Sequence, residues 1–222
     1  MATAVASSRR LSRTVAIVTG GSSGLGAGAA RSLIRQGARV LVADLGHQEE
    51  AFRQWAAAVT GGVKVVSSGE SAGPGQPALS FMETDVTDPS QVTFALDAIE
   101  NRFGEPLNAA VNCAGIAVAR RTLSKKGVHP LEEFTRTLSV NAIGTFNVAS
   151  LSAERMIQRE AATDEDGLRG CIINTASIAA FEGQIGQVAY AASKGAVVGM
   201  TLPMARDLAS FGIRVMTIVR VL

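Results

Sequence analysis

The chain has 222 residues, of which 47% are apolar and 18% charged, a composition that suits one globular domain with a sizeable core and excludes a disordered protein. Its net charge of +2 argues against nucleic acid as a partner. The two cysteines, Cys113 and Cys171, lack the spacing of a metal or redox motif, so we expect no disulfide framework and no metal site. No apolar run reaches the roughly 18 residues that a membrane span needs.

The first 13 residues form an expected N-terminal arm ahead of a single domain over 14–222. The arm carries three arginines and several serines but no acid, and the first acidic residue of the chain is Asp44. This composition resembles a mitochondrial targeting segment, and the alternative interpretation is a short disordered tail. The location is accordingly expected to be mitochondrial or cytoplasmic.

Runs of β-branched and apolar residues alternate with helical patterns, which is typical of βαβ units around a parallel sheet. The predicted strands cover 14–18, 39–43, 79–83, 108–111, 171–174 and 213–219. The predicted helices cover 24–36, 47–59, 89–103, 130–158 with a break near 139–141, and 190–210. Residues 60–77 are rich in glycine, and only the run at 63–66 suggests a strand, so they are predicted as a surface loop carrying a small hairpin. The pattern predicts a Rossmann-like, doubly wound α/β fold.

A glycine-rich turn lies between the first predicted strand and the first predicted helix. Glycine allows the backbone to turn tightly and to approach a pyrophosphate at the helix N-terminus. The residues expected to bind a dinucleotide here are Gly20, Ser22, Ser23, Gly24, Leu25 and Gly26. Asp44 ends the second strand, where an acid binds ribose hydroxyls and repels a 2′-phosphate, so NAD is predicted rather than NADP. The alternative for Asp44 is a helix cap.

Tyr190 and Lys194 are four residues apart and therefore share one face of the last predicted helix. An ammonium beside a phenol favours the phenolate, so Tyr190 is expected to exchange a proton with a substrate oxygen. Ser177, at the end of the fifth strand, is expected to hydrogen-bond the same oxygen. Together with the glycine-rich turn, these three residues predict a site where a proton is exchanged with a bound substrate.

The order of these motifs resembles the short-chain dehydrogenase/reductase family. The resemblance implies that Asn112 and Gly115, in Asn-Cys-Ala-Gly, line the adenosine half of the site, and that Asp85 and Val86 contact adenine. It also implies that Tyr190 and Lys194 contact the cofactor, and that Asn141 holds a water in a proton relay. The alternative for Asn141 is an amide that caps a helix kink.

Longer segments resemble one group of that family, the type-2 3-hydroxyacyl-CoA dehydrogenases, also described as the 17β-hydroxysteroid dehydrogenase type 10 group. They cover 112–119, 174–187, 199–208 and 212–218. The resemblance implies NAD-dependent interconversion of 3-hydroxyacyl-CoA and 3-ketoacyl-CoA in fatty acid metabolism, and assembly as a homotetramer through the helices at 130–158 and 190–210. Ser177, Gln184 and Tyr190 would then contact the substrate, although Gln184 is equally read as a loop amide.

The resemblance stops after Val219, where the family continues with Pro-Gly, a substrate-covering segment and a last strand. We therefore expect the last strand and the covering segment to be missing. Two explanations stay open: an incomplete product of an active enzyme's gene, or a short NAD-binding protein without turnover that acts as a scaffolding subunit. A further alternative function is NAD-dependent reduction of a hydroxysteroid's ketone or of another small ketone.

Overall fold

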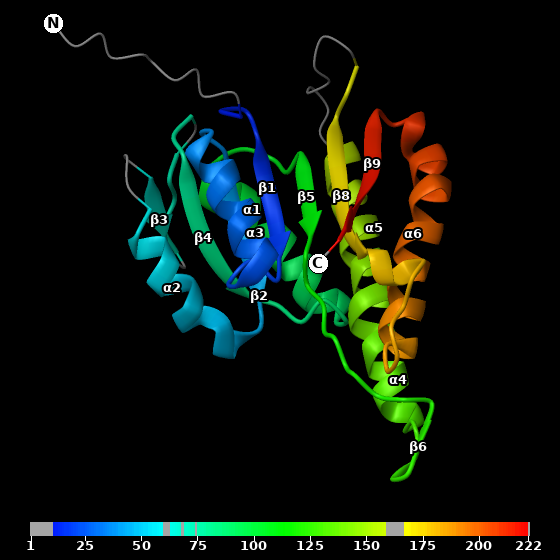
Figure 1. The fold of residues 1–222 in the computed structure, drawn as a ribbon. Helices are drawn as coiled ribbons and strands as arrows, with labels where there is room; N and C mark the ends of the chain where they lie inside the picture. The colour runs from blue at the N-terminus through cyan, green and yellow to red at the C-terminus, as the bar shows by residue number, and fades with distance from the viewer. Residues whose placement is uncertain (1–10, 60–62, 68, 74, 159–166, 222) are drawn as a thin grey trace, which may run out of the picture.

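The computed structural model describes residues 11–59, 63–67, 69–73, 75–158 and 167–221, and most of the arm predicted over 1–13 lies outside them. They form one sheet flanked by helices (Figure 1). Its strands are β1 Val15–Thr19, β2 Arg39–Asp44, β3 Lys64–Val66, β4 Ala78–Glu83, β5 Ala109–Asn112, β8 Gly170–Ser177 and β9 Ile213–Arg220. A separate short hairpin pairs β6 Leu123–Ser124 with β7 Gly127–Val128.

The α-helices confirm the five predicted helical regions. They are α1 Gly24–Arg35, α2 Glu49–Ala57, α3 Pro89–Phe103, α4 Leu131–Leu138, α5 Gly144–Ile157 and α6 Val188–Ala209. Short 3₁₀ turns, η1 Gly46–Gln48 and η3 Ile178–Ala180, follow β2 and β8. No helix in the described part of the chain is both long and apolar enough to cross a membrane.

The sheet has the strand order β3-β4-β2-β1-β5-β8-β9, and every pair in it is parallel. From β1 the chain first winds outward to one side, then returns to place β5 against the other side of β1. The strand order thus reverses between β1 and β5, which confirms the doubly wound α/β prediction. In such sheets, ligands bind beyond the carboxyl ends of the strands at this reversal point.

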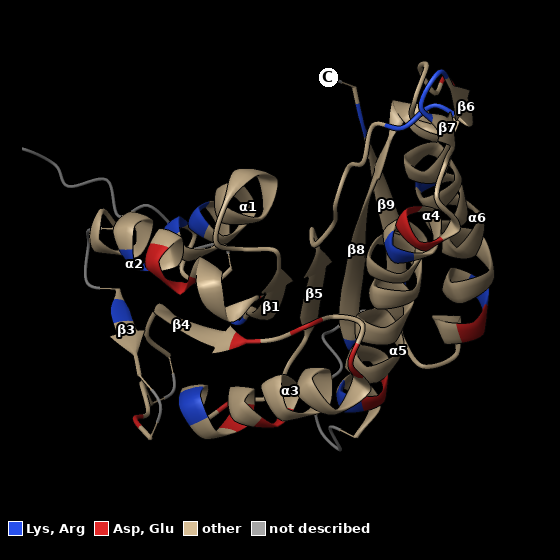
Figure 2. Ribbon diagram, turned by 90° about the horizontal axis from the view of Figure 1, so that it is seen from below, with Lys and Arg blue, Asp and Glu red and all other residues tan. Residues whose placement is uncertain are grey.

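Two buried clusters cover the two faces of the sheet. Val15 and Ile17 of β1 pack with α3, α5 and α6, whereas Ala16 and Val18 pack with α1 and α2. Figure 2 shows α1 and α2 on the opposite side of the sheet from α3. Because successive side chains of a strand point to opposite faces, a parallel strand buried on both faces reads as a continuous apolar run.

The predicted hairpin within 60–77 is wrong. Lys64–Val66 forms β3, which adds to the sheet edge parallel to β4, with Lys64 opposite Ala78. Val66 is only 2% exposed, and its carbonyl accepts a hydrogen bond of 2.7 Å from Ser80 Oγ. Buried Arg102 donates to the same Ser80 hydroxyl. A three-residue strand is too short to show a periodicity in sequence, so burial and these long-range bonds determine its place.

The predicted break near 139–141 is confirmed as a π-helical turn, Ser139–Ile143, between α4 and α5. Thr145 Oγ1 donates to the carbonyl oxygen of Asn141 over 2.7 Å, which offers this carbonyl a partner where the α-helical ladder is interrupted. The turn lies beside the amino-terminal half of α6. A single turn of this type often marks a functional position in a helix.

Candidate active site

The glycine-rich loop between β1 and α1 requires glycine for two different reasons. Gly20 and Gly24 have φ angles of +62° and +50°, in the left-handed region that favours glycine. At Gly26, a Cβ atom would overlap the carbonyl oxygen of Gly20. A Cβ on Gly24 would meet nothing within 4 Å. The loop is thus folded tightly on itself while its outer side stays open to a ligand at the N-terminus of α1.

This open side borders a cavity of about 450 Å³, which we call the glycine-loop cavity. Nine of the residues predicted to bind the cofactor line it: Gly20, Ser23, Gly24, Leu25, Gly26, Asp44, Asp85, Val86 and Gly115. They come from the carboxyl ends of β1, β2, β4 and β5. The structure therefore brings together at the strand-order reversal residues that are almost a hundred positions apart in the sequence.

Asp44 is held by two backbone hydrogen bonds at the end of β2. Its Oδ2 accepts from Ser22 N and its Oδ1 from Leu45 N, both over 2.9 Å. Neither η1 nor α2 has a side-chain cap, so the alternative of a helix-capping aspartate is not what the structure shows. Each carboxylate oxygen keeps a second lone pair, which suits it to accept ribose hydroxyls. Ser22 is 2% exposed and lies beneath the cavity, fixing Asp44.

Asn112 also lies behind the cavity surface. It is 3% exposed, and its Nδ2 donates to Asn174 Oδ1 over 2.9 Å, joining β5 to β8. The residues that follow it reach the cavity instead: Cys113, Ala114, Gly115 and Ile116. The structure thus places Asn112 as a support for that segment.

A second, smaller cavity of about 150 Å³ contains the three residues predicted for proton transfer. Ser177, Tyr190 and Lys194 line this tyrosine cavity, together with Arg220 at the end of β9. Four residues line both cavities: Leu25, Cys113, Gly115 and Ile116. The glycine-loop cavity and the tyrosine cavity therefore adjoin, and a ligand bound in the glycine-loop cavity can reach Ser177, Tyr190 and Lys194.

Lys194 is buried beside the tyrosine. Its Nζ donates to the carbonyl oxygen of Thr175 over 2.8 Å and lies 5.7 Å from the centre of the Tyr190 ring. Burial lowers the pKa of Lys194 below its ordinary value, while the nearby Cys113 has the opposite, smaller effect. Since Thr175 uses one ammonium proton, the others remain for a ribose hydroxyl or a water.

Ser177 Oγ accepts a hydrogen bond of 3.2 Å from Ala179 N in the turn that follows β8. The hydroxyl thereby serves as an acceptor toward the protein, and its own proton is free for a substrate oxygen. Ser177 is 8% exposed, which keeps this interaction away from bulk water. The serine is thus oriented to donate into the tyrosine cavity.

Asn141 braces the π turn against the segment that lines both cavities. Its Oδ1 accepts from Ile116 N, and its Nδ2 donates to Ile116 O and to Ser193 Oγ, at 2.8, 2.8 and 2.9 Å. A Cβ on Gly115 would lie 3.1 Å from Asn141 Oδ1 and 3.7 Å from Lys194 Nζ. Glycine therefore keeps the space between these two polar groups open.

Comparison with known proteins agrees with this geometry. Residues 14–220 match the family described as short chain dehydrogenase. The chain belongs to this family. It is 48% identical to a protein from Bos taurus named 3-hydroxyacyl-CoA dehydrogenase type-2, over 96% of this chain and 74% of that protein. The protein of the same name from Drosophila melanogaster is 46% identical over 94% of this chain and 74% of its own length.

A crystal structure of 3-hydroxyacyl-CoA dehydrogenase type-2 from Mycobacterium avium has a TM-score of 0.77 and 36% identity, covering 97% of this chain and 76% of that one. As a short-chain dehydrogenase, the chain is an oxidoreductase that uses a nicotinamide dinucleotide. The residues present fit such a group: the open side of Gly24 at a helix N-terminus suits a pyrophosphate, and the fixed Asp44 carboxylate suits a ribose.

Sequence reasoning on this short-chain dehydrogenase missed Thr175 and Ser193. Thr175 stands two residues before Ser177, on the same face of β8, and this period-2 spacing is a signal that could have identified it. Ser193 directly precedes Lys194, but its bond to Asn141 joins residues 52 apart and has no signature in sequence.

Gln184 does not reach the tyrosine cavity. It lines a neighbouring cavity, and its backbone N donates to Gln187 Oε1 over 2.9 Å. The residues that the structure describes contain no group of three His, Cys, Asp or Glu side chains that could hold a metal ion.

Proposed function

We propose that this enzyme interconverts 3-hydroxyacyl-CoA and 3-ketoacyl-CoA with NAD. The observation that carries the proposal is the meeting of Ser177, Tyr190 and Lys194 in a cavity that adjoins the glycine-loop cavity. The substrate class is supported by the names of the relatives at 46–48% identity, all 3-hydroxyacyl-CoA dehydrogenase type-2.

NAD supplies the hydride acceptor when it is bound. In the oxidative direction, the Tyr190 oxygen takes the proton of the substrate hydroxyl, while Ser177 Oγ donates a hydrogen bond to the same oxygen. Lys194 keeps its ammonium group beside the Tyr190 ring, 5.7 Å from the ring centre, and is held there by its hydrogen bond to the carbonyl oxygen of Thr175. In the reductive direction, the tyrosine hydroxyl returns the proton to the carbonyl oxygen.

The roles proposed for Asn141 and Gly115 follow from the hydrogen bonds and the space beside Lys194. Asn141 fixes Ile116 and Ser193, and the space kept open by Gly115 between Asn141 and Lys194 is the proposed place of a relay water. NAD is proposed over NADP because Asp44 would repel a 2′-phosphate and the loop offers Ser22 and Ser23 instead of a basic residue.

The direct test is oxidation of NADH by the purified chain with acetoacetyl-CoA, alongside Tyr190→Phe. We expect turnover by the unaltered chain and a loss of about 100-fold or more in kcat for the variant, since general acid–base groups contribute on this scale. Substrates that carry a steroid ketone or a simple ketone, assayed in parallel, test the alternative substrate class. A folded chain that binds NADH but turns over none of these substrates would refute the proposal.

We further propose that the enzyme forms homo-oligomers through α5 and α6. A groove of about 310 Å³ lies between these helices, and three large apolar side chains that line it are exposed: Phe146, Ile157 and Phe211. Such a surface favours burial against another copy. Light scattering on the purified chain would show a mass above that of the monomer, and Phe146→Ser would reduce it.

The arm predicted over 1–13 is the proposed mitochondrial address, and its described end is attached to the domain, since Leu11 N donates to Gln36 O over 3.0 Å. A fluorescent protein fused behind residues 1–30 is expected in mitochondria, and replacement of Arg9, Arg10 and Arg13 by Gln is expected to leave it in the cytoplasm. Cytoplasmic fluorescence from the unaltered fusion would contradict this location.

A further inference from the structure

Arg220 is the last residue of β9, and it lies next to Ser177, the last residue of β8. The two strands run side by side and parallel (Figure 1), and Arg220 is the register partner of Ser177. Both residues line the tyrosine cavity. Neighbouring strands are about 4.8 Å apart, so the base of the arginine side chain lies close to the serine. The guanidinium of Arg220 is therefore within reach of a ligand that Ser177 binds.

The tyrosine cavity is cationic. The described residues that line it include Lys194 and Arg220 but no aspartate or glutamate. Neither cation has an ion pair within the described part of the chain. Lys194 is 5% exposed, and the partner of its ammonium group is the uncharged carbonyl oxygen of Thr175. Charges in enclosed sites are normally paired, so this cavity favours a ligand that brings a negative charge.

The proposed substrate and the cofactor leave the charge of Arg220 unused. The reacting end of a 3-hydroxyacyl thioester is uncharged. The pyrophosphate of the dinucleotide is expected at the N-terminus of α1, and Arg220 is not among the described residues that line the glycine-loop cavity there. A ribose hydroxyl is the expected ligand of Lys194. The guanidinium of Arg220 therefore needs an anionic partner of its own.

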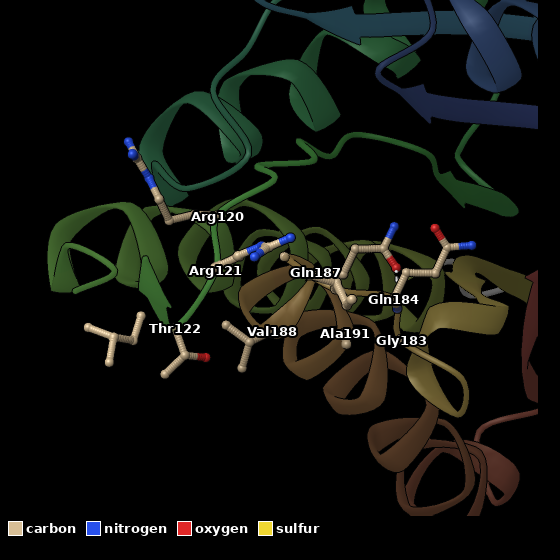
Figure 3. A pocket seen from close by; sticks show the side chains of 11 residues that line it. Arg120, Arg121, Thr122, Gly183, Gln184, Gln187, Val188 and Ala191 are labelled. Carbon is tan, nitrogen blue, oxygen red and sulfur yellow. Dashed lines mark hydrogen bonds between the residues drawn. The ribbon is translucent and has the colours of Figure 1, made fainter. Parts of the chain in front are cut away.

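The arginines of the neighbouring cavity, which Gln184 lines, are separate from this site (Figure 3). Arg120 makes a two-pronged ion pair with Glu133, with Nε–Oε2 and Nη2–Oε1 distances of 3.0 and 2.7 Å, and its side chain points away from that cavity. Arg121 lies over the same cavity, and neither arginine lines the tyrosine cavity. The guanidinium in the tyrosine cavity therefore belongs to Arg220.

From this arrangement we infer that the enzyme also oxidises short hydroxy acids, and that Arg220 binds their carboxylate while Ser177 and Tyr190 hold the hydroxyl. The planar fork of a guanidinium pairs with both oxygens of a carboxylate. In a 2- or 3-hydroxy acid, the hydroxyl and the carboxylate are one or two carbons apart, which suits two residues at the ends of neighbouring strands. The cavity of about 150 Å³ is smaller than the roughly 300–1,000 Å³ of most ligand pockets and suits a compact acid.

The reaction uses the same chemistry at Tyr190 as the proposed function but does not depend on an acyl-CoA substrate. The hydroxyl proton passes to the Tyr190 oxygen, and the hydrogen on the same carbon leaves as a hydride to NAD. A hydroxy acid and NAD thus become an oxo acid, NADH and a proton. The carboxylate is unchanged throughout, and Arg220 contributes by binding and orienting it.

The test compares each oxo acid with its amide, which has nearly the same shape but no charge. NADH oxidation is measured with acetoacetate and acetoacetamide, and with pyruvate and pyruvamide. For the unaltered chain, we expect kcat/KM for at least one acid to exceed that for its amide about tenfold or more, since hydrogen bonds between charged groups are the strong ones. Arg220→Gln should abolish this preference, and Arg220→Lys should keep part of it.

The matched control is Arg214→Gln. Arg214 is exposed, is an even number of residues from Arg220 on the same strand, and therefore stands on the same face, about 20 Å away. This variant should keep the preference for the acid over its amide.

Calorimetric titration adds a measurement that needs no turnover. An oxo acid titrated into the chain with NAD cannot react, because the oxidised cofactor has no hydride to give. We expect Arg220→Gln to weaken binding of the preferred acid about tenfold and to leave the dissociation constant of NADH unchanged.

The outcomes separate this inference from the proposed function. If acetoacetyl-CoA is turned over but neither acid is preferred to its amide, the inference is overturned and the function stands. If neither the thioester nor the acids are turned over, the proposed function fails, and the titration decides: equal acid binding by the unaltered chain and Arg220→Gln, or no binding, overturns the inference. If Arg220→Gln weakens NADH as much as the acid, the guanidinium serves the dinucleotide, and the inference is again overturned.

Discussion

The side-chain amide of Asn141 donates a hydrogen bond to the hydroxyl of Ser193 over 2.9 Å, and both residues are fully buried. Ser193 Oγ in turn donates to the carbonyl oxygen of Tyr190 over 2.7 Å. The π turn and the catalytic helix α6 are thus connected one residue from Lys194. Through Ile116, the same amide also fixes the segment shared by the glycine-loop and tyrosine cavities.

Ser193→Ala should therefore lower kcat about tenfold while leaving KM for the cofactor nearly unchanged. The change leaves one Asn141 N–H without its buried partner, and a lost buried hydrogen bond costs about 1–3 kcal/mol. Steady-state kinetics over a range of pH measure this, and we expect the profile of kcat to shift because Lys194 and Tyr190 are less well placed.

Ser152→Ala is the matched control, since Ser152 is equally buried but its hydroxyl has no hydrogen-bond partner among the residues that the structure describes. It should keep kcat and its pH profile. Equal kinetics for the two alanine variants would contradict a positioning role for Ser193.

Asp44→Asn should reduce the preference for NADH over NADPH. The variant keeps an acceptor for Ser22 N but loses the charge that binds ribose hydroxyls and repels a 2′-phosphate. Hydrogen bonds to charged groups contribute about 1.5–3 kcal/mol, so the dissociation constant for NADH should rise roughly tenfold or more. Fluorescence titration with both dinucleotides measures the change. The control is Asp97→Asn at an exposed position of α3, which should alter the dissociation constant of neither NADH nor NADPH.

Gly26→Ala and Gly28→Ala, both in α1, should have opposite effects on the stability of the fold. The first places a methyl group on the carbonyl of Gly20 and should lower the free energy of unfolding by about 1–3 kcal/mol and weaken dinucleotide binding. The second places a methyl group that meets no described atom within 4 Å, and it should raise the free energy of unfolding by about 0.5–1 kcal/mol through helix propensity. Urea denaturation with and without NADH tests both, and a stable, NADH-binding Gly26→Ala would show that the loop is less tightly packed than described.

Burial raises the pKa of the Cys113 thiol to about 11. This pKa lies above that of a cysteine in the unfolded chain, so the thiol stays protonated in the folded chain until the pH approaches 11. The contribution of Cys113 to the free energy of unfolding is therefore lost as the pH rises from about 9 through 11. Alkylation of Cys113 by iodoacetamide should be slow at pH 8 and accelerate toward pH 11, as mass spectrometry can follow. Rapid modification of Cys113 at pH 7 would contradict the raised pKa. The urea-unfolded chain, in which the thiol is exposed, serves as the control.

Much of the fold was predictable because its signals are local. Glycines in a strand-to-helix turn and continuous apolar strands each depend on residues close in sequence. The same holds for Tyr190 and Lys194, whose spacing places them on one helix face.

What the sequence could not predict depends on contacts between distant residues. The place of β3 comes from Arg102 and Ser80, and the withdrawal of Asn112 from the cavity comes from Asn174, 62 residues away. Gln184 lines a different cavity from Tyr190, in a segment that a backbone hydrogen bond from Arg120 N to Gly186 O joins to a distant part of the chain. No periodicity or motif records such pairings.

The pairing of β1 with β5 also has a consequence for folding. Ala16 lies opposite Ala109, and Asn108 Oδ1 accepts from Val15 N across 93 residues. Closing so long a loop is slow compared with forming the helices and the β1–β2 pair, because the entropy of closure is lost before the contact compensates for it. During refolding, helical circular dichroism should therefore recover first, and the capacity to bind NADH should return only in a later, slower phase.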